Sequence, residues 1–170
     1  MPDDTAIHEG GCACGHVRYR VESKPLIAHC CHCSMCQRQS GSAFAVNALI
    51  EADRVRLLQG DVTEVTVPSP SGKGQVIARC AKCQVAVWSN YLIFYKGTLG
   101  DAIRFIRVGT LDDPSKIPPD VHIFTSSKQP WLVLPPDAQV VEEYYVTQDV
   151  WPKESLDRMA AMLAAVQNPD

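Results

Sequence analysis

The stretch His29-Cys30-Cys31-His32-Cys33-Ser34-Met35-Cys36-Gln37-Arg38 carries four of the eight cysteines and two of the five histidines of the chain. The remaining cysteines form two close pairs, Cys12-x-Cys14 and Cys80-x-x-Cys83, each at a point where a strand is expected to turn. Cysteines in close pairs are typical of metal sites in a reducing compartment. The cysteine pattern is therefore the starting point for both fold and function.

The two outer pairs predict a closed zinc site. Two knuckles from distant strands can bring Cys12, Cys14, Cys80 and Cys83 around one ion as a tetrahedral four-sulfur site with no open position. Two disulfides or four buried free thiols are the alternative. The short spacings and the expected cytosolic location favour metal.

The central stretch predicts a second and different site. Cys31, Cys33 and Cys36 supply three thiolates from six residues, which leaves the fourth position of a bound ion free, as in catalytic zinc sites. Adjacent side chains of an extended segment point to opposite faces, so Cys30 is interpreted as a buried bystander. By the same alternation His32 points away from the metal, with direct ligation as the alternative. The roles of Cys30, His29 and His32 stay open.

Composition limits the class of protein. The chain has 170 residues, a net charge of -3 and 46% hydrophobic residues, which predicts one globular domain over residues 1–170. A Lys/Arg block is missing, which argues against nucleic-acid binding. Residues 1–11 lack the features of a signal peptide and no long apolar run suggests a membrane span, so a cytoplasmic protein is expected. Self-association into a homo-oligomer is left open.

Hydrophobic periodicity predicts a mainly β fold, with a core over about residues 8–150. Two of the expected strands, 54–59 and 62–67, are joined through Gly60-Asp61, which predicts a hairpin. From Pro152 the apolar residues recur at three- and four-residue steps, which predicts a C-terminal helix over about 152–167. The other expected strands are 17–21, 26–29, 43–50, 75–79, 86–90, 103–108, 121–125 and 142–146.

The chain resembles the glutathione-dependent formaldehyde-activating enzyme family, also called centromere-protein-V-like. The resemblance spans residues 11–131 and is carried by four groups of residues. They are Gly11-Cys12-Ala13-Cys14-Gly15 with Tyr19, Cys31 to Arg38, Cys80-x-x-Cys83 with Trp88, and Ile123-Phe124 with Lys128 and Pro130-Trp131. One departure is Gln84, where members of the family usually have glycine.

The resemblance implies a β-tent of short antiparallel strands around zinc knuckles and two Zn²⁺ per chain, a structural ion on Cys12, Cys14, Cys80 and Cys83 and a second ion on Cys31, Cys33 and Cys36. It also implies a carbon-sulfur lyase that joins glutathione to formaldehyde as S-hydroxymethylglutathione. Small-molecule thiols and aldehydes are thus the expected partners. A non-catalytic zinc-binding interaction module of the same fold is the alternative, because a fold alone does not determine activity.

Three residues are candidates for holding the substrate. Glutathione carries two carboxylates, so a cationic partner is expected, and Arg38 and Lys128 are the candidates. Trp131 is a candidate for the pocket wall. A solvated surface charge, for the two cations, and core packing, for the aromatic ring, are the alternatives.

Overall fold

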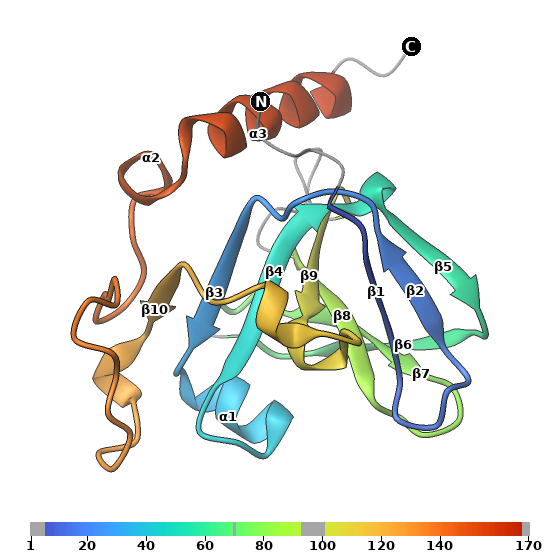
Figure 1. Ribbon diagram of the computed structural model, residues 1–170, viewed down its shortest axis with the longest axis horizontal. Helices are drawn as coiled ribbons and strands as arrows, with labels where there is room; N and C mark the ends of the chain where they lie inside the picture. Colours follow the sequence, from blue (N-terminus) through green and yellow to red (C-terminus); the bar gives the residue numbers. More distant parts are fainter. Residues whose placement is uncertain (1–5, 70, 93–100, 168–170) are drawn as a thin grey trace.

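The computed structural model describes residues 6–69, 71–92 and 101–167, and within them the chain forms two β-sheets and a long C-terminal helix (Figure 1). The smaller sheet has the order β1 (His8–Gly11), β2 (Arg18–Val21) and β5 (Val55–Gln59). The larger sheet has the order β10 (Val121–Ile123), β3 (Ile27–Cys31), β4 (Ala45–Glu51), β9 (Ile103–Arg107), β8 (Ala86–Tyr91), β7 (Gln75–Cys80) and β6 (Val62–Val67). The mainly β prediction is confirmed.

Helices occupy few of the described residues. The helix α1 (Ser34–Ser40) follows β3, and the short α2 (Thr147–Val150) precedes α3 (Lys153–Gln167). The predicted C-terminal helix is therefore confirmed within about one residue at its start. In the part of the chain that is described, none of the helices combines the length and apolar character needed to cross a bilayer.

The strands β3, β4 and β9 of the larger sheet are mostly buried, and apolar residues pack on both faces of the sheet. On one face Ala48, Ile106 and Trp88 pack against residues of the smaller sheet, among them Tyr19, to form the first core. On the other face a second core includes Leu49, Phe105, Ile123 and Trp151. Strand β3 contributes to both cores, which explains why all five of its residues are buried.

The predicted hairpin of residues 54–59 and 62–67 is wrong, although both strands exist. Strand β5 pairs with β2 in the smaller sheet, whereas β6 pairs with β7 in the larger sheet. Gly60, with a φ of 78°, turns the chain from one sheet to the other directly beside the Cys12–Gly15 turn, where an added Cβ would lie 2.2 Å from the His16 carbonyl oxygen. The turn is thus a crossing between sheets.

Two further expectations differ from the structure near β10. Residues 142–146 form no strand, although the amide of Phe124 donates to the carbonyl of Glu143 at 2.8 Å. Single backbone hydrogen bonds of this kind join the segment to β10 and the residues after it, without a continuous ladder. Strand β10 itself pairs with β3 in parallel, an exception to the expected antiparallel pairing.

Candidate metal centres and adjoining cavities

The structure brings the two outer cysteine pairs together where the two sheets meet. Cys12 and Cys14 lie in the turn between β1 and β2, Cys80 ends β7, and Cys83 lies in the turn between β7 and β8. The four Sγ atoms lie within 4.8 Å of one another, with 3.5 Å between Cys12 and Cys14 and 3.8 Å between Cys14 and Cys80. Four sulfurs at about 2.3 Å from one ion in a tetrahedron stand about 3.8 Å apart, so these residues fit a closed zinc site.

Backbone amides also point to the sulfurs of this closed cluster. The amide of Val17 donates to Cys12 Sγ at 3.2 Å, and the amides of Lys82 and Cys83 donate to Cys80 Sγ at 3.4 and 3.5 Å. Such hydrogen bonds stabilise thiolates, which are the metal-binding form of cysteine. All eight cysteines are free thiols, so the disulfide alternative is not supported.

The second cluster lies at the junction of β3 and α1. Cys31 ends the strand, Cys33 is the N-cap of the helix and Cys36 lies in its first turn. The three Sγ atoms lie within 4.8 Å of one another, and the Cys36 amide donates to Cys33 Sγ at 3.3 Å. The start of α1 therefore brings the three thiols close together. Three thiolates are a donor set that fits a zinc ion with one open coordination position.

The thiols of this second cluster differ in acidity. Hydrogen bonds from the Cys31 and Cys36 thiols, and then from backbone amides, lower the pKa of Cys33 to about 2. Hydrogen bonding to Cys33 and Cys36, together with burial, raises the pKa of Cys31. One thiolate is thus favoured in the cluster before any cation is bound.

Cys30 points away from this cluster, as the alternation along β3 predicted. It groups instead with His32 and His122, on the opposite face of the strand. Burial and then the charges of His122 and Lys128 lower the pKa of His32 to about 4, so the imidazole is neutral at physiological pH. His32 lies outside the three-thiol cluster because its ligand atoms group with Cys30 and His122.

A cavity of about 260 Å³ adjoins Cys31 and Cys33. Its described lining is mainly aromatic and apolar, with Tyr91, Phe105, Ile123, Phe124 and Tyr144. His29 also lines it, hydrogen-bonded to the Tyr145 hydroxyl, and burial lowers the pKa of His29 to about 4. This apolar cavity therefore presents a neutral imidazole and aromatic walls to the thiols.

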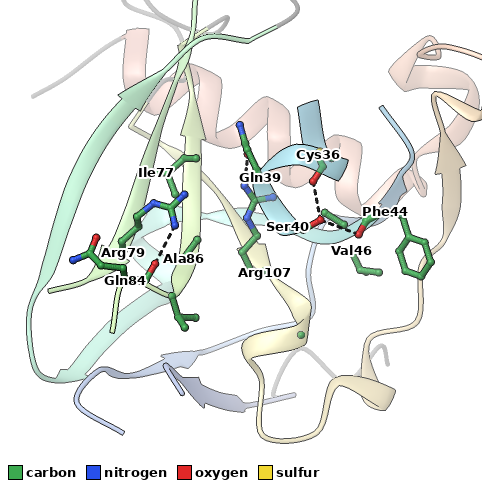
Figure 2. A pocket seen from close by; sticks show the side chains of 13 residues that line it. Cys36, Gln39, Ser40, Phe44, Val46, Ile77, Arg79, Gln84, Ala86 and Arg107 are labelled. Carbon is green, nitrogen blue, oxygen red and sulfur yellow. Dashed lines mark hydrogen bonds between the residues drawn. The ribbon is translucent and has the colours of Figure 1, made fainter. Parts of the chain in front are cut away.

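A second cavity, a groove of about 460 Å³, adjoins Cys36 on the other side of the cluster. Arg79 from β7 and Arg107 from β9 reach into it (Figure 2). The Arg107 guanidinium donates to Asn47 and, at 3.2 Å, to Gln39 Oε1. Arg79 donates to the Gln84 carbonyl at 3.0 Å. The three-thiol cluster thus lies between an apolar cavity and a groove with two cations.

The substrate-binding candidates lie elsewhere among the described residues. Arg38 is exposed on α1, and Trp131 is 69% exposed. Lys128 donates to the carbonyls of Leu132 at 2.6 Å and Gln129 at 3.1 Å. None of the three lines either described cavity. The sequence does not single out Arg79 and Arg107, because each alternates with apolar residues like a solvent-facing side chain of a strand. They line a groove only because α1 packs beside the sheet.

Comparison with known proteins gives a family match and two similar proteins. A family model described as "Glutathione-dependent formaldehyde-activating enzyme" matches residues 7–127. A Halomonas elongata protein named "Putative glutathione-dependent formaldehyde-activating enzyme" is 26% identical over 128 residues, which are 73% of this chain and 78% of that protein. The crystal structure of a Rhodobacter sphaeroides protein is 21% identical with a TM-score of 0.46, and the match covers 64% of this chain and 93% of that one. Because the family model matches well over half of its length, the chain belongs to the glutathione-dependent formaldehyde-activating enzyme family.

Proposed function

We propose that the protein joins the thiol of glutathione to formaldehyde, giving an S-hydroxymethyl adduct, in a carbon-sulfur lyase type of reaction at zinc held by Cys31, Cys33 and Cys36. The observation that carries this proposal is the position of the three thiols between two cavities, one with two arginines and one without a cation among its described lining residues. Membership of the family supports glutathione and formaldehyde as the substrate pair.

The reaction needs a thiolate and a carbonyl carbon in contact. When bound, zinc supplies a position at which a thiol loses its proton. The new bond forms between sulfur and carbon, and the carbonyl π electrons move to oxygen. The oxygen then takes up one proton, which balances the proton that the thiol lost. Because a free thiol with a pKa near 8.5 is about 3% ionised at pH 7, ionisation alone contributes at most roughly 30-fold. The remainder must come from positioning.

The groove supplies the positioning on the glutathione side. Arg79 and Arg107 present guanidinium groups near Cys36, and guanidinium groups bind carboxylates through paired hydrogen bonds. Asn47 and Gln39 hold Arg107 in one orientation (Figure 2 shows the bond to Gln39). A carboxylate bound there would direct the thiol of the same molecule towards the cluster. The apolar cavity on the other side excludes water from the carbonyl.

The rate of adduct formation from glutathione and formaldehyde, followed by NMR line exchange, tests the proposal. We expect acceleration by the zinc-loaded protein and its loss in Cys33→Ser. Arg107→Met should reduce the rate with glutathione roughly tenfold or more, since a hydrogen bond to a charged group contributes about 1.5–3 kcal/mol. The same variant should leave the rate with 2-mercaptoethanol, which has no carboxylate, nearly unchanged.

Arg56→Met is the matched control, because Arg56 lies on the surface in an ion pair with Glu22 at 3.1 Å, outside both cavities. A zinc-loaded protein that gives no acceleration would contradict the proposed activity and favour the non-catalytic zinc-binding module. If Arg107→Met accelerates the reaction of glutathione as much as the unsubstituted protein does, the proposed activity stands and the proposed role of the arginines is contradicted.

A further inference from the structure

Three metal-binding side chains that the proposed function does not use are brought together by the register of the larger sheet. Cys30 and His32 are two residues apart along the extended chain at the end of β3, so their side chains share a face. In the parallel pairing of β10 with β3, His122 lies directly opposite Cys30. The sheet therefore places one thiol and two imidazoles on the face opposite Cys31.

The distances between these three side chains match the needs of one small ion. Their ligand atoms lie within 4.8 Å of one another. His32 Nε2 is hydrogen-bonded to His122 Nδ1 at 3.0 Å, a bond that an ion between the two nitrogens would replace, and the two rings are nearly parallel at 23°. Around a tetrahedral zinc ion two imidazole nitrogens stand about 3.3 Å apart, and a nitrogen and a sulfur about 3.6 Å apart. The present nitrogen separation would thus need to change by only a few tenths of an ångström.

Two of the three residues, Cys30 and His32, are buried, whereas His122 is partly accessible to solvent. Cys30 is 2% exposed and His32 is fully buried, with the Phe44 ring 5.6 Å from the imidazole. His32 Nδ1 is a buried polar atom that has no hydrogen-bond partner among the described residues. His122 is only half-buried and gives a route from solvent. The nearby charge of Lys128 opposes a cation here, and a Cys30 thiolate would offset it.

We propose that Cys30, His32 and His122 form a third metal site, which takes zinc or a similar divalent ion through two imidazoles and one thiolate and leaves a fourth position to solvent. Imidazole and thiolate together suit zinc among the common divalent ions. The ion joins the three-residue strand β10 to β3. Because Ile123 and Phe124 of this segment line the apolar cavity, the site fixes one wall of that cavity.

The test is zinc content per chain after reconstitution of the full-length protein with excess Zn²⁺ and gel filtration. We expect three equivalents in the unsubstituted protein. Cys30→Ser and His122→Gln should each lose one equivalent, and the double variant Cys33→Ser/His122→Gln should lose two. His8→Gln is the control, since His8 lies on β1 outside the three clusters and should lose none.

A zinc content that is unchanged in His122→Gln would overturn the proposal, and this variant decides even if Cys30→Ser does not fold, because His122 is half-buried on an edge strand. Cobalt gives a second readout. The Co²⁺-thiolate absorbance should fall in Cys30→Ser by the contribution of one thiolate, and an unchanged absorbance would contradict ligation by Cys30. Neither result depends on the glutathione reaction, so failure here is distinct from failure of the proposed function.

Discussion

Gln84 ends the Cys80–Cys83 turn in a left-handed backbone conformation, with a φ of 62°. This conformation costs a residue with a Cβ roughly 1–2 kcal/mol, and glycine avoids that cost. The Gln84 side chain offsets part of it, since its amide donates to the carbonyls of Cys80 at 3.2 Å and Ala81 at 3.4 Å. The departure from the family pattern, visible in the sequence, thus leaves the knuckle intact in the structure.

The stability of variants at Gln84 should therefore follow how well each residue tolerates a left-handed backbone conformation. Gln84→Val should lower the free energy of unfolding by about 1–2 kcal/mol, because a β-branched residue disfavours this region and forms no side-chain hydrogen bonds there. Gln84→Gly is the matched control, and its free energy of unfolding should exceed that of Gln84→Val by at least about 1–2 kcal/mol. Melting temperatures at a fixed zinc concentration measure the order. A valine variant as stable as the glycine variant would contradict this explanation.

Tyr19 is fully buried between the two sheets, and its hydroxyl is hydrogen-bonded to Thr110 Oγ1 at 2.7 Å. Burial raises the pKa of Tyr19 to about 12, from an ordinary value near 10. Below pH 10 the side chain is protonated in both the folded and the unfolded chain. Between pH 10 and pH 12 only the unfolded chain loses the proton, so folding loses up to about 3 kcal/mol as the pH rises.

Tyr19→Phe should remove that contribution. The variant is expected to be less stable at neutral pH, because the hydrogen bond between Tyr19 and Thr110 is lost, yet its free energy of unfolding should fall less steeply between pH 10 and pH 12. Urea titrations across this range compare the two slopes. Equal slopes would show that Tyr19 ionises in the folded protein as readily as in the unfolded chain.

At the scale of elements, α3 is attached to the larger sheet by an ion pair as well as by apolar contacts. Arg158 donates to both carboxylate oxygens of Glu51 on β4, at 2.6 and 2.9 Å, and Glu51 is only 8% exposed at its side chain. Ser155 also donates to the Leu26 carbonyl at 2.6 Å. The start of the helix is thus held to the ends of β3 and β4.

Removing Arg158 should therefore be costly, because it leaves the Glu51 charge buried with the more distant Arg54 at 3.6 Å as a remaining partner. Arg158→Met should lower the free energy of unfolding by about 3 kcal/mol, at the low end of the range for a broken buried pair. Lys153→Met is the control, because its pair with Asp157 is exposed and should contribute less than about 1 kcal/mol. Chemical denaturation of both variants gives the comparison, and equal losses would contradict a special role for the buried pair.

The sequence predicted which segments are strands better than it predicted how they pair. Alternation and turn residues depend on local chemistry, so β2, β4, β7 and α3 were expected close to their observed bounds. Pairing depends on distant contacts. The Gly60-Asp61 turn looks the same whether its strands pair with each other or separate into two sheets. The helix α1 was not predicted, because the Cys31–Cys36 segment at its start was interpreted only as a metal site.

For the site, the sequence indicated the grouping of the thiols because ligand spacing is local. Nothing in the sequence indicated Arg79 and Arg107, because the groove that they line is formed by α1 together with β4, β7, β8 and β9. The sequence also left Cys30 without a role, because its neighbour His122 is brought to it only by the parallel pairing of β10 with β3. The roles of Arg38, Lys128 and Trp131 in substrate binding stay predictions, and none of the three lines the described cavities.

At the scale of the whole molecule, the closed cluster links the two sheets, with one cysteine pair from each (Figure 1 shows the β1–β2 and β7–β8 turns at the same end). A structural zinc site contributes about 10–16 kcal/mol, comparable to the whole net stability of a domain at about 5–15 kcal/mol. An ion at the second cluster binds within β3 and α1 and joins no separate sheets.

Cys83→Ser should therefore abolish cooperative thermal unfolding or lower the melting temperature severely, with loss of one zinc equivalent. Cys33→Ser should lose one equivalent as well and keep a cooperative transition, because its site is not needed to join the sheets. Circular dichroism and metal analysis of the two variants give the result. Equal stability of the two variants would contradict the division into a structural and an open site.

If Cys31, Cys33 and Cys36 leave a metal position open to an external thiol, glutathione should bind at that position, and titration of the cobalt-substituted protein with glutathione measures this binding. We use the His122→Gln variant, which lacks the third site and its open position, and expect the cobalt-thiolate absorbance to rise on addition of glutathione and to saturate at one equivalent per chain. The same titration of Cys33→Ser/His122→Gln should give no such rise. An absorbance that glutathione leaves unchanged in His122→Gln, or a rise that persists in the double variant, would contradict an open position at Cys31, Cys33 and Cys36.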